Sequence, residues 1–262
     1  MALHELLRPR SGLRVLVTAG GSGIGASVAR AFHAVGARVH VCDVDRSALD
    51  RLTGATPGIT GSMADTSVAA DVDAVFEDVR SHLGGLDVLV NNAGIAGPIG
   101  PIEDMAAADW DRTVAVNLDS QYYFARRAIP HLLASPDPSL IAMGSVASRL
   151  GYAFRTPYAA SKWGIVGLTQ SLAIELGPQG VRVNAILPGA VEGDRVSSVP
   201  AARAAALGVD VDAMREQYRR KSSLRRMVSA DDVAALALFL CSPAARNLTA
   251  QVISVDCNLE YL

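Results

Sequence analysis

Short apolar segments alternate with longer helical patterns along almost the whole chain, and this alternation constrains the fold more than any other feature. Alternating strands and helices predict a parallel sheet with helices packed on it. Apolar runs without a polar residue at every second position, such as Val15-Leu16-Val17, are typical of strands covered on both sides. We therefore predict an α/β fold: a Rossmann-like, doubly wound parallel sheet in three layers, α/β/α. The predicted strands are residues 14–18, 38–43, 59–63, 87–91, 139–143, 181–187 and 251–255.

The length of the chain and the positions of its prolines and glycines indicate that residues 1–262 form one domain. Half of the 262 residues are apolar, which suits one core of nearly the largest size that single domains reach. Proline and glycine fall between the predicted elements, and we find no repeat or low-complexity linker. The least regular stretch, about 192–228, is rich in Ala and Arg and follows a predicted strand end, so we expect a substrate lid there.

Charge and cysteine content exclude several classes of protein. The formal net charge is −2 without a Lys/Arg-rich run, so we expect no nucleic-acid partner. Cys42, Cys241 and Cys257 lie far apart without a CxxC spacing, which predicts neither disulfides nor a metal site. No apolar stretch has the length of a membrane span or the form of a signal segment. We expect a cytoplasmic protein with no membrane partner.

A glycine-rich turn at residues 18–25 connects the first predicted strand to a helical pattern. Gly20, Ser22, Gly23, Ile24 and Gly25 lie where glycines admit a pyrophosphate to the backbone and the helix N-terminus attracts it. A glycine cluster alone is weak evidence for dinucleotide binding, because any tight strand-to-helix turn can use glycine.

An acidic residue at the end of the second strand strengthens this interpretation. Asp43 stands twenty residues beyond Gly23, where a carboxylate accepts hydrogen bonds from an adenosine ribose. By spacing alone, an ordinary turn-starting Asp is an equal alternative. Turn and acid together favour dinucleotide binding, and the acid repels a ribose 2′-phosphate. We therefore predict NAD over NADP, with Arg46 as the one nearby cation that opposes this prediction.

Tyr158 and Lys162 share one face of a predicted helix, because they are four residues apart. A phenol with its usual pKa of about 10 needs a nearby cation to act as a base at neutral pH, and Lys162 supplies one. Ser145 follows the fifth predicted strand at the sheet edge where ligands bind, and can hydrogen-bond a reacting oxygen. The alternative for an isolated YxxxK is a surface Lys beside a half-buried Tyr.

From about Gly12 to Asp256 the chain resembles the classical short-chain dehydrogenase/reductase family. The motifs that agree in order and spacing are Gly23-Ile24-Gly25, Asn91-Asn92-Ala93-Gly94, Asn117, Ser145, Tyr158 with Lys162, and Pro188-Gly189. The resemblance implies that Tyr158 is the general acid/base, that Lys162 lowers its pKa and binds the nicotinamide ribose, and that Ser145 orients the substrate oxygen. It also implies that Asn117 anchors a water that links Lys162 to solvent. Asn117 has an alternative as a buried polar residue satisfied by the backbone.

The resemblance also implies the remaining cofactor contacts. Asp65 would meet the adenine edge, although it has an alternative as an acid near a helix N-terminus. Asn91, Ala93 and Gly94 would line the adenosine cleft, and Ile186, Pro188, Gly189 and Val191 would hold the nicotinamide. Two departures stand out. Ala19 replaces a usual glycine, which we expect Gly20 and Gly21 to make tolerable, and Gly193 replaces a Thr that clamps the carboxamide.

The predicted reaction is hydride transfer between NAD and a secondary alcohol or ketone. Alternatives are a 3-oxoacyl thioester reductase using NADPH and a non-catalytic dinucleotide-sensing regulator on the same fold. Epimerases and dehydratases of related folds share the YxxxK motif but usually carry a longer substrate domain after it, so we do not expect their activity here. The resemblance implies a homotetramer, and Ala159, Ala160, Gly164 and Gly167 suit either close packing between subunits or packing on the sheet.

Two arginines, Arg149 and Arg155, lie between Ser145 and Tyr158, in the segment that walls the substrate pocket in this family. Arg155 stands three residues before Tyr158, where its guanidinium could hold a carboxylate or phosphate in a bidentate fork. The commoner arrangement is that Arg155 or Arg149 pairs with Glu192 or Asp194 on the lid, or points into solvent across a subunit interface. We expect a small polar substrate, a sugar, polyol or hydroxy acid, with Arg155 as a candidate substrate-binding residue.

Overall fold

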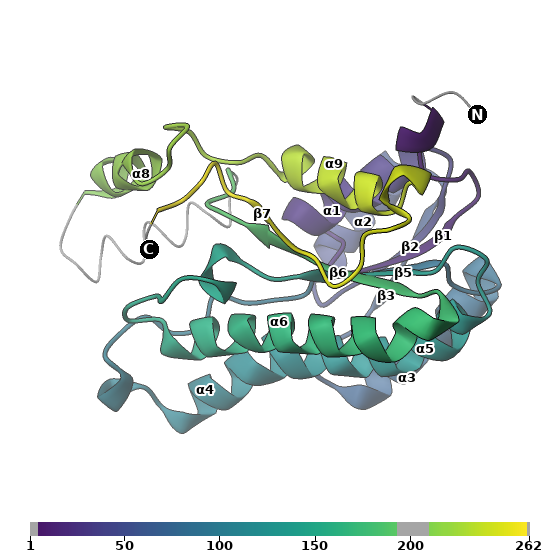
Figure 1. Cartoon of the computed structure of the whole chain (residues 1–262). Helices are drawn as coiled ribbons and strands as arrows, with labels where there is room; N and C mark the ends of the chain where they lie inside the picture. Colours follow the sequence, from purple (N-terminus) through teal and green to yellow (C-terminus); the bar gives the residue numbers. More distant parts are fainter. Residues whose placement is uncertain (1–4, 193–209, 261–262) are drawn as a thin grey trace.

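Seven parallel strands form one sheet in the order β3-β2-β1-β4-β5-β6-β7 (Figure 1). The computed structural model describes residues 5–192 and 210–260. The strands are β1 (Arg14–Thr18), β2 (Arg38–Asp43), β3 (Ile59–Met63), β4 (Val88–Asn91), β5 (Ser139–Met143), β6 (Arg182–Pro188) and β7 (Val252–Val255). The helices are α1 (Gly23–Ala34), α2 (Arg46–Ala55), α3 (Ala69–Leu83), α4 (Ala107–Val114), α5 (Ser120–Leu133), α6 (Thr156–Leu176), α8 (Val211–Arg220) and α9 (Ala230–Leu240).

Each face of the sheet carries its own apolar core. Val15 and Val17 of β1 lie in one core with Phe32 of α1, whereas Leu16 lies in the other with Phe124 of α5. Figure 1 shows α1 and α9 on one side of the sheet and α3, α5 and α6 on the other. The predicted doubly wound α/β/α fold is confirmed. The predicted strand ends differ from the observed ones by one residue in β4, β6 and β7.

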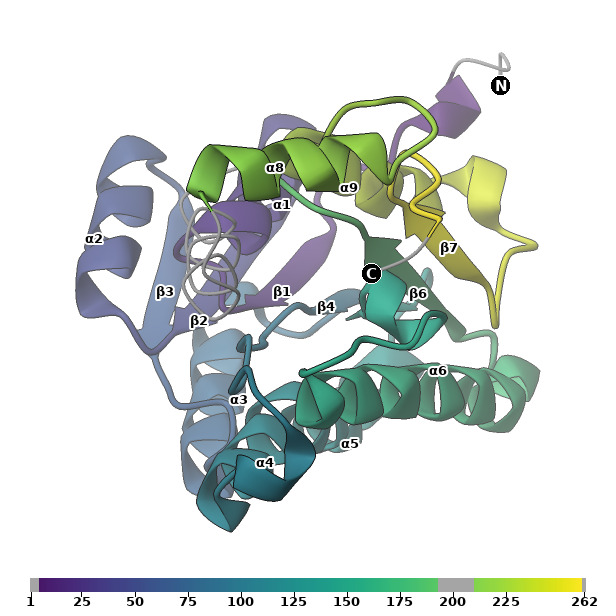
Figure 2. The same cartoon turned by 90° about the vertical axis from the view of Figure 1, so that its left-hand side faces the viewer.

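The strand order reverses direction between β1 and β4, which are neighbours in the sheet. The chain leaves β1 toward one face and β4 toward the other, so a crevice opens beyond their carboxyl ends. Figure 2 looks at the molecule from the end at which α8 lies, with β1 and β4 side by side near the centre. The glycine turn after β1 and the Asn91–Gly94 motif after β4 therefore meet at the binding edge of the sheet. In the described part of the chain, no helix is long and apolar enough to cross a membrane.

A buried polar cluster on β2 and β3 makes the fold sensitive to acid. The His40 ring is fully buried and contacts Thr60 Oγ1 at 2.7 Å and Ser62 Oγ at 2.9 Å. Burial, and after it the charge of the nearby His82, lower the pKa of His40 to about 4, although Asp78 acts in the opposite direction. The folded protein thus holds His40 neutral across the range in which an unfolded histidine takes up a proton.

We expect acidification to reduce the free energy of unfolding through His40. Because the folded pKa lies below the unfolded value of about 6.5, the stability contribution is complete above that value and falls as pH decreases toward 4. Between pH 7 and pH 5 the loss should be about 2 kcal/mol, on the order given by this shift. Urea titrations at both pH values measure it. His40→Gln should remove most of the difference, whereas His131→Gln should retain it. An equal pH dependence in His40→Gln and the wild type would refute this assignment.

Candidate active site

The glycine turn is tied to the end of β4 by a set of hydrogen bonds. Asn92 Nδ2 donates to the carbonyls of Thr18 and Ala19, at 2.9 and 3.1 Å. Thr18 Oγ1 accepts from the backbone N–H groups of Asn92 and Ala93, both at 2.9 Å. Ala19 itself has a φ of 49°, in the left-handed region that costs a non-glycine residue about 1 kcal/mol. The turn therefore accepts Ala19, as predicted, but in a conformation that a glycine would adopt more easily.

At two positions of the glycine turn there is no room for a side chain, whereas at a third position a side chain would meet no other atom. A Cβ at Gly25 would lie 2.2 Å from the Ala19 carbonyl oxygen, and one at Gly20 would lie 2.6 Å from Val41 Cβ. An added Cβ at Gly23, by contrast, would meet nothing within 4 Å. Ser22 starts α1 without capping it through its side chain, so the first N–H groups of the helix remain available to an anion. These features fit a pyrophosphate at the N-terminus of α1.

Asp43 joins this turn to the end of β2. Its Oδ2 accepts from the Gly21 N–H at 2.9 Å, and its Oδ1 accepts from the Asp45 N–H at 3.1 Å. The side chain is almost fully buried, and Arg46 follows as the exposed first residue of α2. The predicted meeting of turn and acid is therefore present in the structure, and each carboxylate oxygen keeps further acceptor capacity for ribose hydroxyls.

Asp65 and Asn91 make protein contacts that the motif alone does not predict. Asp65 Oδ1 accepts from the N–H and hydroxyl of Ser67, and Arg112 pairs with Oδ2 at 3.0 Å. Burial raises the pKa of Asp65, but the Ser67 and Arg112 contacts outweigh it and lower the pKa below its usual value. Asn91 Nδ2 donates to the Gln121 carbonyl on α5, so its side chain faces away from the turn. The adenine contact of Asp65 stays a prediction.

Tyr158 and Lys162 lie on the first turns of α6, beside the carboxyl end of β5. Lys162 is almost fully buried and its Nζ donates to the Met143 carbonyl at 2.9 Å. The same Nζ lies 5.8 Å from the centroid of the half-buried Tyr158 ring. The alternative of a surface lysine is therefore wrong, and the cation is placed where it can act on the phenol.

Ser145 follows β5 directly and is held by a short 3-10 turn, Val146–Ser148. Its Oγ accepts from the Ala147 N–H at 3.2 Å, and its own N–H donates to Ser148 Oγ. Ser148 Oγ in turn donates to the Lys162 carbonyl at 2.7 Å. Because Ser145 Oγ only accepts in this turn, its hydroxyl proton remains for a substrate oxygen.

Asn117 lies in a π-helical segment, Ala115–Asp119, that joins α4 to α5. Such segments are rare in proteins overall, but they occur often at functional sites. Asn117 Oδ1 accepts from the Ile95 N–H at 2.7 Å, and Nδ2 donates to the Ile95 carbonyl and to Ser161 Oγ, each at 3.1 Å. A Cβ at Gly94 would lie 3.3 Å from both Asn117 Oδ1 and Lys162 Nζ. The missing side chain of Gly94 therefore lets the two groups approach the same point.

The segment after β6 leaves the sheet against the end of β7. Gly189 lies so close to Asp256 that a Cβ would be 2.7 Å from the Asp256 Cα, and Ile186 and Pro188 are buried. Val191 forms an isolated parallel bridge with Val228, at the far end of the predicted lid. Gly193, Asp194 and the rest of that lid up to residue 209 lie outside the described residues. The part of the predicted lid that the structure describes contains α8, which Figure 1 shows at the end of the molecule where α6 begins.

The contacts of the two arginines before Tyr158 differ from the ion pairs expected with the lid. Arg149 pairs with Asp256 Oδ2 at 2.5 Å and also donates to the Leu259 carbonyl. Arg155 is buried, donates through Nη2 to the Ala96 carbonyl at 2.6 Å, and forms no ion pair with the exposed Glu192. Arg155 therefore does not pair with Glu192 and instead turns inward against aromatic rings, while the other predicted partner, Asp194, lies outside the described residues.

Several residues of this site were not singled out from the sequence. Ser148 and Ser161 hold Lys162 and Asn117 in place, Thr18 joins the two loops, and the Met143 carbonyl accepts from Lys162. The only sequence signal is their closeness to the recognised motifs. In residues 5–192 and 210–260, no group of three His, Cys, Asp or Glu side chains gathers as a metal site would require.

Comparisons with known proteins agree with this geometry. A family model described as Enoyl-(Acyl carrier protein) reductase matches residues 18–258. D-beta-hydroxybutyrate dehydrogenase of Cupriavidus necator is 36% identical over 252 residues, 94% of this chain and 97% of that protein. Galactitol 2-dehydrogenase of Agrobacterium fabrum is 33% identical over 243 residues, 92% of this chain and 94% of that protein. The crystal structure of levodione reductase aligns with a TM-score of 0.89 at 29% identity, covering 95% of this chain and 98% of that one.

These matches span nearly the whole chain and include the motifs that form the site. The three named proteins are dehydrogenases or reductases. In this chain Lys162 lies near the Tyr158 ring, and Lys162 and Asn117 both approach Gly94, in the loop that Asn92 bonds to the glycine turn. The chain therefore belongs to the short-chain dehydrogenase/reductase family and is an oxidoreductase that acts on CH–OH groups with a nicotinamide cofactor.

Proposed function

We propose that the chain is an NAD-dependent dehydrogenase of small polar secondary alcohols: sugars, polyols or hydroxy acids. The observation that carries this proposal is the buried Lys162 ammonium, fixed on the Met143 carbonyl and held 5.8 Å from the Tyr158 ring. A cation so placed favours the phenolate, which is the form of tyrosine that can accept a proton at neutral pH. The same residues run the reverse reaction on a ketone.

In the proposed reaction, the Tyr158 oxygen accepts the proton of the substrate hydroxyl. Ser145 Oγ donates to the substrate oxygen and holds it in place as its charge develops. The bound nicotinamide supplies the hydride acceptor. Lys162 stabilises the phenolate and would hydrogen-bond the nicotinamide ribose, while Asn117 and Gly94 shape the point at which a water would connect Lys162 to solvent.

The preference for NAD is supported by the acid at the end of β2. The Asp43 carboxylate is tied to the Gly21 and Asp45 N–H groups, so it cannot turn away from an adenosine ribose without losing both bonds. A fixed carboxylate accepts hydrogen bonds from two ribose hydroxyls and repels a 2′-phosphate. Arg46 is the cation whose side chain would oppose this preference.

The substrate class is supported by the names of the relatives. One is a dehydrogenase of a hydroxy acid and another of a polyol. A contact between Arg155 and an acidic substrate group remains part of this proposal, and it would use guanidinium N–H groups other than the one bound to Ala96. Arg155→Ala should then raise KM for an acidic substrate far more than for its neutral analogue.

A 3-oxoacyl thioester reductase using NADPH is the second candidate, because the matching family model is named for an acyl carrier protein enzyme. Assays of NADH formation from alcohols, polyols, sugars and hydroxy acids, run in parallel with NADP and with thioester reduction by NADPH, distinguish the two. Turnover of a small alcohol with NAD supports our proposal, and turnover restricted to thioesters with NADPH refutes it. A lack of turnover with every substrate would favour a dinucleotide-sensing regulator.

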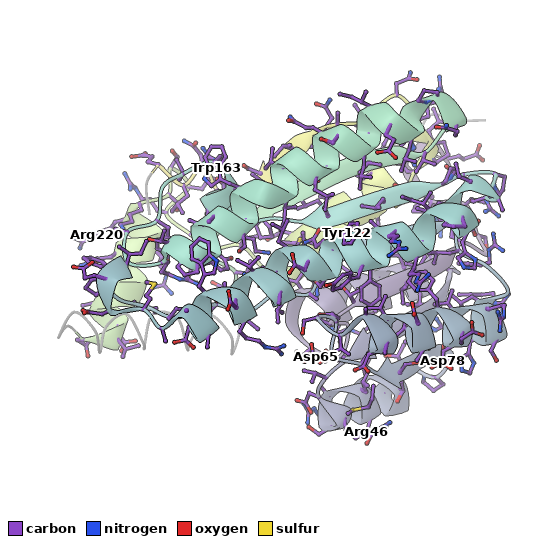
Figure 3. The ribbon with its side chains drawn as sticks, turned by 90° about the horizontal axis from the view of Figure 1, so that it is seen from below. Arg46, Asp65, Asp78, Tyr122, Trp163 and Arg220 are labelled. Carbon is purple, nitrogen blue, oxygen red and sulfur yellow. The ribbon has the colours of Figure 1, made fainter. Side chains whose placement is uncertain are left out.

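We also propose that the enzyme is a homotetramer and that copies meet through α5 and α6. Trp163 and Ile174 of α6 are 50% and 77% exposed, and Tyr122 of α5 is 48% exposed. Trp163 and Tyr122 are labelled on these two helices in Figure 3. Apolar side chains of this size on one face are typical of a subunit interface. The cytoplasmic location remains a prediction that cell fractionation can check.

Ile174→Asp should reduce the assembly to a smaller species, because a carboxylate would be buried unpaired at the interface. Light scattering coupled to size exclusion measures the mass. Leu7→Asp, which also alters an exposed apolar residue but lies near the N-terminus, should leave the assembly intact. A monomeric wild type, or an Ile174→Asp variant of unchanged mass, would contradict the proposed interface.

A further inference from the structure

The guanidinium of Arg155 is buried, and no carboxylate in residues 5–192 or 210–260 forms an ion pair with it. Arg155 is only 4% exposed. Its Nη2 donates to the Ala96 carbonyl, and its Nε has no hydrogen-bond partner among the described residues. A buried cation with so few partners is destabilising unless other groups compensate it. Among the described residues, the groups left to stabilise this charge are the aromatic rings beside it.

Two tyrosine rings cover the guanidinium. Its Cζ lies 4.2 Å from the centroid of the Tyr158 ring and 4.7 Å from that of Tyr152. The rings themselves meet edge to face, with centroids 6.4 Å apart and an interplanar angle of 78°. A planar guanidinium stacks well on aromatic faces, where the ring quadrupole attracts it. One of these two faces belongs to the residue that exchanges the proton.

Tyr158 therefore has two cations beside it. The charged or titratable groups near its ring include Arg155 at 4.2 Å, Lys162 at 5.8 Å, and Tyr152. Negative charge that forms on the phenol is attracted by both cations, and little water separates them in a buried site. Arg155 is the nearer cation to the ring, and its charge is permanent because a guanidinium does not lose its proton in proteins.

We propose that Arg155 is a positioning residue for the reaction, which fixes the Tyr158 ring and, together with Lys162, stabilises the phenolate that accepts the substrate proton. This inference rests on the proposed function, in which Tyr158 is the proton acceptor. It gives the two cations different tasks. Lys162 can pass a proton toward solvent and lose its charge for a moment, whereas Arg155 keeps the site positive throughout. Tyr158 can then remain a phenolate, the form that accepts a proton, while Lys162 passes a proton toward solvent.

The test is the ionisation of Tyr158 in the enzyme without cofactor or substrate. Ultraviolet absorbance of the phenolate is followed against pH in each protein and in the same protein carrying Tyr158→Phe, and the difference isolates Tyr158. Arg155→Met should raise the pKa of Tyr158 by about one unit, the low end of the shift expected when a cation beside the phenolate is removed. Arg155→Lys should restore most of the shift. Arg155→Gln, which keeps a donor for Ala96, serves if Arg155→Met does not fold.

The matched control is Arg149→Met, because Arg149 lies in the same segment but pairs with Asp256. It should leave the Tyr158 titration unchanged. In turnover with a neutral alcohol, Arg155→Met should move the acid limb of the kcat profile by the same amount and change KM little. An unmoved titration in folded Arg155→Met or Arg155→Gln, or an equal shift in Arg149→Met, would overturn the proposal. Because the titration needs neither NAD nor substrate, it is independent of whether the proposed function holds.

Discussion

Tyr158→Phe should abolish most turnover while cofactor affinity stays close to that of the wild type. The substitution removes the hydroxyl that exchanges a proton with the substrate and almost no volume, so the ring keeps its contacts with Arg155 and Lys162. A positioned general acid or base contributes a factor of roughly 10² to 10⁴ to the rate. We expect kcat to fall by that factor at every pH, and the dissociation constant for NADH to change little. Steady-state kinetics and fluorescence titration with NADH measure the two quantities.

Tyr152→Phe is the matched control for this substitution. Tyr152 packs edge to face on Tyr158 and covers the other side of Arg155, so Tyr152→Phe removes a phenol hydroxyl from the same cluster and keeps both ring faces. It should retain most of the activity. Comparable turnover in Tyr158→Phe and the wild type would remove Tyr158 from the chemistry, and an equal loss in both variants would show that the cluster as a whole tolerates no change.

The sheet was predictable because its strands carry their own signal. A strand covered on both faces is apolar over most of its length, and short apolar runs such as 15–17 and 88–90, which alternate with longer helical patterns, are typical of such strands. Tyr158 and Lys162 were predictable because a spacing of four places two side chains on one face of any helix. Both signals are local, so they require no knowledge of distant contacts.

The π-helical turn at Asn117 depends instead on contacts far along the chain. The partners of Asn117 are the backbone of Ile95 and the hydroxyl of Ser161, 22 and 44 residues away. The bonds to Ile95 anchor the loop after β4 to the segment between α4 and α5. No periodicity in residues 115–119 reports a partner at such a distance.

The contacts of Arg155 depend on backbone geometry that the sequence does not report. The sequence places acids at Glu192 and Asp194, and charge alone favours pairing with them. In the structure, Phe154 adopts a left-handed φ of 63°, rare for an aromatic residue, and the Arg155 N–H donates to the Tyr152 carbonyl. This tight turn directs the guanidinium between the two rings. Backbone strain of this kind often occurs at active sites, but composition does not reveal it.

Asp43→Ala should narrow the preference for NAD over NADP by acting on both cofactors. With NAD, loss of hydrogen bonds to a charged acceptor should lower kcat/KM by roughly 10- to 100-fold. With NADP, removal of the carboxylate lifts the repulsion of the 2′-phosphate, so kcat/KM should rise or stay constant. The variant should also be less stable, because the part-buried N–H groups of Gly21 and Asp45 lose their acceptor.

Asp45→Ala separates the effect on specificity from the effect on stability. Asp45 lies two residues from Asp43 and accepts from the Ser47 and Ala48 N–H groups at the start of α2, where loss of an N-cap costs about 1 kcal/mol. Its carboxylate belongs to the helix cap rather than to the glycine turn, so Asp45→Ala should lower the melting temperature and leave the NAD/NADP ratio of kcat/KM unchanged. If the ratio moves equally in both variants, the discrimination comes from the general negative charge of this edge. If the wild type prefers NADP, the role of Asp43 is wrong, and Arg46→Ala becomes the variant that should reverse the preference, because Arg46 is then the group that holds the 2′-phosphate.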